Sequence, residues 1–115
     1  MPTTPNLHLR GFRKRSGLTQ SDVARLLGRI SPSPISRLET GEQTPDLRTA
    51  LLLEVVFGAS ASQLFRTTFQ QLAKKVRDRA ALLEDSLALQ SDTPDTRRRR
   101  SELKAIIARI DRLVA

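Results

Sequence analysis

The chain has 115 residues, no cysteine, and 20 lysine and arginine residues against 12 aspartate and glutamate residues, which gives a formal net charge of +8. A basic balance of this size is typical of proteins that neutralise phosphates, although alone it does not separate DNA from RNA or from an anionic membrane. The lack of cysteine excludes a disulfide framework, thiol chemistry and a cysteine-ligated zinc site.

Composition also bears on location and on the kind of nucleic acid. The first residues lack a charged head followed by an apolar run, and nowhere do about 18 apolar residues stand together. We therefore expect a cytoplasmic protein with no membrane partner. With 3% aromatic residues and neither tryptophan nor tyrosine, the chain is poorly suited to stacking on single strands, which favours double-stranded DNA over RNA.

The first predicted helix covers residues 5–16. Thr4 precedes it as a candidate cap, and Gly17 follows it as the residue at which it ends. Leu9 and Phe12 lie three residues apart, so they share one side of the helix, and we expect that side to face inward.

The second predicted helix begins at Gln20 and is about two turns long. Thr19 is its expected cap, because its hydroxyl can accept a hydrogen bond from the backbone N–H of Asp22 while the carboxylate of Asp22 reaches back. The apolar face of this helix consists of Val23, Ala24 and Leu27.

A short polar turn after Gly28 leads to a third helix, which begins near Ser31 or Ser33 and ends at Gly41. Its prolines are tolerated because N–H groups in the first turn of a helix have no helical partner. We expect two apolar residues to face inward, Ile35 and Leu38, and four polar ones to point outward, Ser33, Ser36, Arg37 and Thr40. A pair of short helices of this kind presents its second helix to a groove of DNA.

Two further helices are expected before residue 66. Asp46 caps the first of them, over residues 47–57, and Gly58 ends it. Residues 60–63 have the spacing of a capping box that opens the second, which places Leu64 and Phe65 in the core.

The helix over residues 47–57 has more apolar residues than can be buried on one side of it. Its expected inward stripe consists of Leu47, Ala50, Leu51 and Val56. Leu52 and Val55 lie off that stripe. Two interpretations remain open: they are ordinary surface residues, or the C-terminal half or a second subunit buries them.

The remainder of the chain favours long helices, since glycine is absent after residue 65 and proline occurs once. One apolar stripe consists of Phe69, Leu72, Val76, Ala80, Leu83 and Leu87. Thr93 and Pro94 are placed as the cap and first residue of another helix. A second stripe consists of Leu103, Ile107, Ile110 and Val114, with Ile106 and Leu113 beside it.

Two of these motifs carry a family resemblance. Gly17-Leu18-Thr19-Gln20 and the later run from Ile35 to Gly41 stand at nearly the spacing of the Xre/Cro-like helix-turn-helix family, the phage-repressor type, which the chain resembles over residues 7–65. The resemblance implies a five-helix DNA-binding domain over 1–65. The apolar stripes beyond it predict a helical hairpin over 66–115, so we expect an all-α fold. Two departures affect base reading: the turn before Ile35 is one residue longer than usual, and Pro32 and Pro34 replace polar residues.

The resemblance also implies the contacts to DNA. Arg37 is the candidate for a bidentate contact to guanine, with Ser33 and Ser36 as weaker readers of bases. The candidate phosphate contacts are Gln20, Thr40, Gln43, Thr44, Arg10, Arg13 and Lys14. Glu39 occupies a position that usually looks inward, so we expect an ion pair or a cap bond, with Arg13 as a partner. The alternative for Arg37 is a surface salt bridge to Glu39 or Glu42.

Four consecutive arginines, residues 97–100, form the longest run of like charge in the chain. If the last helix starts at Pro94, these cations sit near its N-terminus, where the helix dipole disfavours them. One interpretation is a second contact to phosphate. The other is a solvated run, or a loop in which Ser101 is the cap.

An enzyme is not expected, because His8 is the only histidine and nothing can share a metal ion with it; no cofactor is expected either. Two functions remain. The first is a sequence-specific transcriptional regulator, a repressor that binds an inverted-repeat operator as a homodimer. The second is an interaction protein, an antitoxin or bridging factor, whose C-terminal helices bind a protein partner.

The C-terminal stripes supply the expected dimer or partner interface. Its candidate residues are Leu83, Leu87, Leu103, Ile107, Ile110 and Val114. Neither helix is stable alone in water without a packed face, so the pair folds as a hairpin, against the DNA-binding domain or against a second copy. The alternative to dimerisation is that the hairpin only enlarges the core of the monomer.

Overall fold

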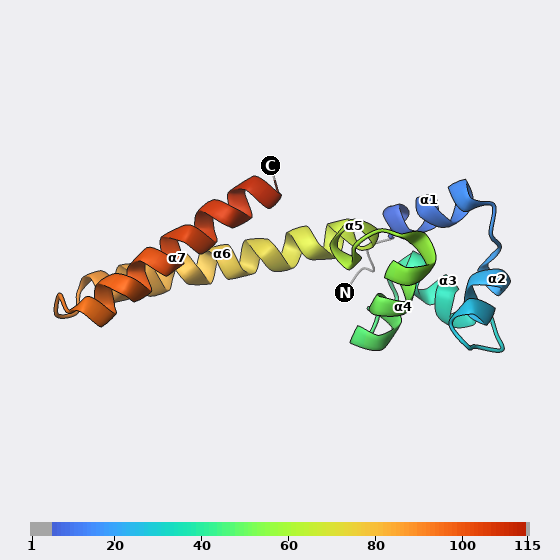
Figure 1. Cartoon of the computed structure of the whole chain (residues 1–115), viewed down its shortest axis with the longest axis horizontal. Helices are drawn as coiled ribbons and strands as arrows, with labels where there is room; N and C mark the ends of the chain where they lie inside the picture. Colours follow the sequence, from blue (N-terminus) through green and yellow to red (C-terminus); the bar gives the residue numbers. More distant parts are fainter. Residues whose placement is uncertain (1–5, 115) are drawn as a thin grey trace. The chain divides into compact units, whose positions relative to one another are not determined.

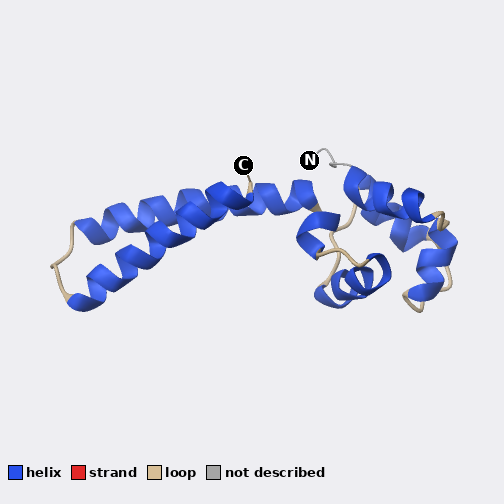
Figure 2. Cartoon of the chain, turned by 45° about the horizontal axis from the view of Figure 1, so that its top comes forward, coloured by secondary structure: helices blue, strands red, loops and turns tan. Residues whose placement is uncertain are grey.

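A computed structural model describes residues 6–114, and between these limits the chain forms seven helices and no strand (Figures 1 and 2). The predicted all-α fold is confirmed. The described residues fall into two compact units, one that extends to Thr68 and one that begins at Phe69. Within the same range, no helix has both the length and the apolar character that crossing a membrane requires.

The first unit contains five helices, as the sequence predicted. They are α1 (Leu7–Ser16), α2 (Gln20–Leu26), α3 (Ser33–Thr40), α4 (Leu47–Phe57) and α5 (Ala61–Leu64). The chain continues into α6 (Arg66–Ala88) and α7 (Pro94–Leu113). The boundary between the units falls in the first turn of α6.

Two predicted capping boxes are confirmed. The backbone N–H of Asp22 donates to Thr19 Oγ1 at 3.0 Å, and the N–H of Thr19 donates back to Asp22 Oδ2 at 3.0 Å. These hydrogen bonds hold the pKa of Asp22 below its usual value. The same reciprocal pair joins Ser60 and Gln63 ahead of α5, at 3.2 and 3.0 Å. Local sequence alone therefore fixes where α2 and α5 begin.

The predicted start of α1 is wrong. The helix begins at Leu7, because Asn6 Oδ1 accepts the backbone N–H of Leu9 at 3.0 Å and so acts as the cap. Thr4, the expected cap, lies outside the described residues. At the other end of the chain the expected cap of α7 is confirmed, since Thr93 Oγ1 accepts the N–H of Thr96 at 3.1 Å.

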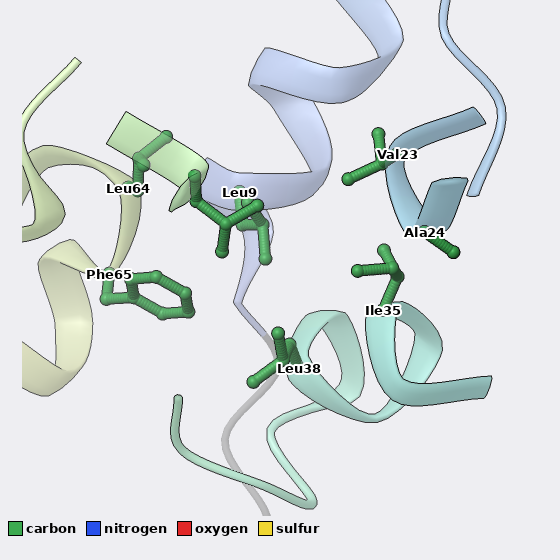
Figure 3. Packing of buried hydrophobic residues seen from close by; sticks show 8 residues of the cluster. Leu9, Val23, Ala24, Ile35, Leu38, Leu64 and Phe65 are labelled. Atoms are coloured by element: carbon green, nitrogen blue, oxygen red, sulfur yellow. The ribbon is translucent and has the colours of Figure 1, made fainter. Parts of the chain in front are cut away.

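One hydrophobic core holds the first unit together. Its buried residues are Leu9, Val23, Ala24, Ile35, Leu38, Leu53, Leu64 and Phe65. Figure 3 shows Val23 and Ala24 of α2 facing Ile35 of α3, while Leu9 lies on the side of Leu64 and Phe65. The residues expected to face inward from α2, α3 and α5 therefore do so.

The predicted inward stripe of α4 is wrong. Leu53 is fully buried, whereas Leu47 is 75% exposed and Leu51 is 50% exposed. Most positions of this helix are apolar, so periodicity does not fix which side turns inward. A tertiary contact helps to orient it, since Glu54 Oε1 accepts the backbone N–H of Ala61 at 2.7 Å. Leu52 is partly buried and Val55 stays exposed.

The second unit is a hairpin in which α6 and α7 run antiparallel, side by side (Figure 2). Ala73, Ala80 and Leu87, seven residues apart, are the buried residues of α6, and Ile110 is buried on α7. Of the predicted stripe of α6, Ala80 and Leu87 are buried, whereas Leu72, Val76 and Leu83 remain about half exposed.

Candidate DNA-binding surface

α2 and α3 form the two arms of a helix-turn-helix. Gly28 adopts a positive φ of 76° after α2, a backbone conformation that favours glycine, and the N–H of Arg29 donates back to the carbonyl of Ala24 at 2.8 Å. α3 begins at Ser33, one of the two predicted positions, whose N–H donates to Ser31 Oγ at 3.2 Å. The turn is therefore closed by its own hydrogen bonds.

A buried carboxylate connects α3 to the two helices that precede it. Glu39 Oε2 accepts from Arg13 Nε at 2.6 Å, and Oε1 accepts from Arg13 Nη2 at 3.0 Å. Gln20 Nε2 also donates to Oε1, at 3.2 Å. The third guanidinium nitrogen, Arg13 Nη1, donates to the carbonyl of Leu18 at 3.1 Å. The predicted pairing of Glu39 with Arg13 is confirmed.

This network is largely shielded from water, with 12% of the Arg13 side chain and 4% of the Glu39 side chain exposed. The hydrogen bonds that Arg13 donates to Glu39 raise the pKa of Arg13, against the opposing effect of burial. Because a bidentate pair fixes direction as well as distance, it holds α3 at one angle to α1 and α2. The outward side of α3 is thereby set by groups on its inward side.

The outward side of α3 carries one cation and several hydroxyl groups. Arg37, Ser33 and Thr40 are exposed, and Ser36 is partly buried. Arg37 forms no ion pair with any residue between 6 and 114, so the predicted alternative of a salt bridge to Glu39 or Glu42 is not present. An exposed guanidinium keeps its donor fork available for an acceptor outside the protein.

Residues after α3 are exposed and polar. Gly41 ends the helix with a φ of 82°, and the backbone N–H of Gln43 donates to the carbonyl of Arg37 at 3.2 Å. The side chains of Gln43 and Thr44 are exposed. Thr40 differs, because its hydroxyl donates to the carbonyl of Arg37 at 3.2 Å and is used within the helix.

The candidate cations of α1 separate into two kinds. Arg10 and Lys14 are exposed, whereas all three guanidinium nitrogens of Arg13 donate hydrogen bonds to Glu39 or to the carbonyl of Leu18.

Arg29, which was not predicted as a DNA contact, is an exposed cation in the turn between α2 and α3. Its position directly after the turn glycine is the signal that could have drawn attention to it.

The residues predicted to form a dimer or partner interface in the C-terminal helices differ in burial. Leu87 and Ile110 are buried inside the hairpin, whereas Leu83 is exposed and three candidates are partly exposed, Leu103, Ile107 and Val114.

Two of the four consecutive arginines are paired inside the hairpin unit. Arg97 pairs with Asp92 at 2.9 Å, and Arg100 pairs with Glu84 at 2.9 Å. Arg98 and Arg99 are exposed and have no ion-pair partner in the part of the chain that the structure describes. The run lies within α7, so Ser101 is not its cap.

The packing of α2 on α3, with a polar outward side on the second helix, defines a helix-turn-helix DNA-binding protein. Comparison with known families agrees, since residues 9–64 match the model of the helix-turn-helix family, and this part of the chain belongs to its Xre/Cro-like type. Searches of curated proteins and of solved structures found no match to the chain. The protein is a DNA-binding helix-turn-helix regulator. Within residues 6–114, no group of three potential metal ligands comes together.

Proposed function

We propose that the protein is a cytoplasmic repressor that binds one double-stranded DNA sequence, an inverted repeat, as a homodimer. The observation that carries this proposal is the contrast between the two sides of α3. Its inward side is fixed by the buried Glu39 network, and its outward side presents Arg37 without an internal partner. A rigid helix with an unused donor fork suits direct reading of base edges.

The proposed contacts follow from which donors remain available. Arg37 reads guanine O6 and N7, and Ser33 and Ser36 are weaker readers of bases. Phosphate contacts come from Gln43, Thr44, Arg10, Lys14 and the second amide N–H of Gln20. We leave out Arg13 and Thr40 because their donors are already used inside the protein.

The specificity that an operator requires favours a dimer over a monomer. One recognition helix touches only a few base pairs, whereas two half-sites about 34 Å apart roughly double the contacts. In this proposal residues 1–65 bind DNA and residues 66–115 provide the dimer contact. The hairpin from Phe69 onward is compact by itself, which favours a role other than completing the core of the first unit.

Selection from a pool of random duplexes tests this function. The full chain is incubated with the pool at about 0.15 M salt, where phosphate contacts alone give weak binding, and the retained duplexes are sequenced. We expect an inverted repeat with a guanine in each half-site. Retention of no common sequence would contradict the proposal and would favour a protein whose helical fold serves contact with another protein.

Substitution of the exposed Arg98 and Arg99 tests whether the hairpin also contacts DNA phosphates. If each arginine neutralises one phosphate, changing both to alanine should flatten the slope of log K against log salt by about 1.8. The matched control changes Arg97 and Arg100, which are already paired with Asp92 and Glu84. A slope that is the same in the wild type and the Arg98/Arg99 variant removes this second contact.

A further inference from the structure

The two flanks of the α6–α7 hairpin differ in chemistry. One flank, which we call the open flank, consists of Leu72, Val76 and Leu83 of α6 with Leu103 and Ile106 of α7. A groove of about 220 Å³ lies between the two helices there, lined in part by Val76, Leu83 and Ile106. A second groove of about 230 Å³ shares Leu83 and Leu103 with the first, so the apolar surface is continuous along the hairpin.

The opposite flank is closed by ion pairs between the same two helices. Arg77 Nε lies 2.6 Å from Asp111 Oδ1, and Arg100 Nη2 lies 2.9 Å from Glu84 Oε1. On that side the charged groups of α6 and α7 pair with one another. The open flank, by contrast, places exposed and partly exposed apolar side chains of both helices around two grooves.

We propose that the open flank binds the open flank of a second copy of this chain and forms a four-helix bundle. This inference rests on the proposed function, in which the repressor acts as a dimer, and it identifies the surface and the partner. In a two-fold interface each copy contributes the same residues, so Leu83 and Ile106 of both copies lie in the shared core. The arrangement matches helix bundles, whose cores form between apolar faces of helix pairs.

The dimensions of the hairpin fit a second copy of the chain on the open flank. α6 has 23 residues and α7 has 20, so the pair is roughly 30 Å long. A flank of that length and two helices wide offers an area on the order of that which one partner contributes to a stable interface, about 800 Å². A short peptide would cover only part of it.

The charges along the groove also favour a second copy. Arg79, Arg99 and Glu102 line the two grooves together with apolar side chains. A self-complementary interface needs both signs of charge at its edge, because each edge meets the edge of an identical surface. DNA would instead need a surface of positive charge without an apolar centre.

Another exposed apolar surface is confined to a single helix. Leu47, Leu51, Leu52 and Val55 line an apolar groove of about 380 Å³ on α4. It lies on a single helix of 11 residues, about 16 Å long, and offers less length than the hairpin. We therefore assign the dimer contact to the open flank and use α4 as an alternative in the test.

Sedimentation of the full chain at micromolar concentration, without DNA, tests the assignment. The wild type should sediment at twice the 12.9 kDa of one chain. Leu83→Glu and Val76→Glu should each raise the dimer dissociation constant at least about 100-fold, because two carboxylates would be buried at the centre of the interface. The matched control is Leu82→Glu, a neighbour that is 71% exposed and lines neither groove, and it should remain a dimer.

Circular dichroism of each variant shows that the helices remain, and Val76→Glu replaces Leu83→Glu if the latter loses helix. A monomeric wild type overturns the inference. A dimer that both variants leave intact also overturns it, and dissociation by Val55→Glu would then place the contact on α4. DNA selection is a separate readout, so a dimer that selects no sequence would contradict the proposed function and leave this interface standing.

Discussion

Replacement of Glu39 with alanine should destabilise the first unit by about 3 kcal/mol, because removal of one partner from a buried pair leaves the other charge uncompensated. Arg13 would lose two of its hydrogen bonds while 12% of its side chain faces water, which places the expected cost at the lower end of the usual range. Amide hydrogen exchange at Val23 and Ile35 in the full chain measures this change, since both lie in the core beside α2 and α3.

The matched control for this prediction is Glu42→Ala. Glu42 is exposed, and its removal should change stability by less than about 0.5 kcal/mol. A double variant, Glu39→Ala with Arg13→Met, should be less destabilised than Glu39→Ala alone, because no charge is left unpaired. Equal exchange rates in Glu39→Ala and Glu42→Ala would show that the network does not hold α3 in place.

Replacement of Arg37 with alanine should weaken binding of the dimer to the selected operator by at least about 30-fold, because one bidentate base contact of about 1–3 kcal/mol is lost from each of the two half-sites. The preference for guanine at one position of each half-site should be lost as well. Stability should hardly change, since Arg37 is exposed and forms no ion pair within the described range. Titration with operators that differ at each position measures both effects.

Arg37→Lys separates base reading from attraction to phosphate. A lysine keeps the charge but lacks the planar fork, so specificity should fall while the salt dependence stays nearly the same. Arg48→Ala, on α4 and also exposed, controls for a general loss of positive charge. If Arg37→Ala leaves the preference at every operator position unchanged, the assignment of Arg37 to a base is wrong.

The parts of this fold that were predictable from sequence are those decided by local chemistry. Thr19 with Asp22, and Ser60 with Gln63, set the starts of α2 and α5 through hydrogen bonds three residues apart. Glycines at the ends of α1, α3 and α4 have the positive φ angles expected there. The paired motifs around α2 and α3 then identified the helix-turn-helix, and the family match over residues 9–64 agrees.

The predictions that failed concern which side of a helix is buried, in helices where apolar residues occur on several sides. α4 is so rich in apolar residues that several of its sides are equally plausible, and its contacts with other helices select Leu53. In α6 the expected stripe included the larger side chains, but two of its three buried positions are the alanines Ala73 and Ala80. The predicted stripe did not distinguish these buried positions from Leu72, Val76 and Leu83, which remain about half exposed.

The candidate site shows the same limit. Arg13 was assigned two roles, a phosphate contact and a partner for Glu39, and sequence alone could not decide between them. The buried geometry decides, because all three guanidinium nitrogens have acceptors inside the protein. The contact of Gln20 with Glu39 was not predicted, since the two residues are 19 positions apart and meet only through the packing of α2 on α3.

Nuclear magnetic resonance titration of the full chain with a duplex retained in the selection tests the central claim most directly. We predict that the amide signals of Ser33, Ser36 and Arg37 shift most as the duplex is added. Signals from the exposed side of α6, at Leu82, should stay in place. A saturated complex in which the α3 signals have not moved would contradict the account, because the outward side of that helix would not then face DNA.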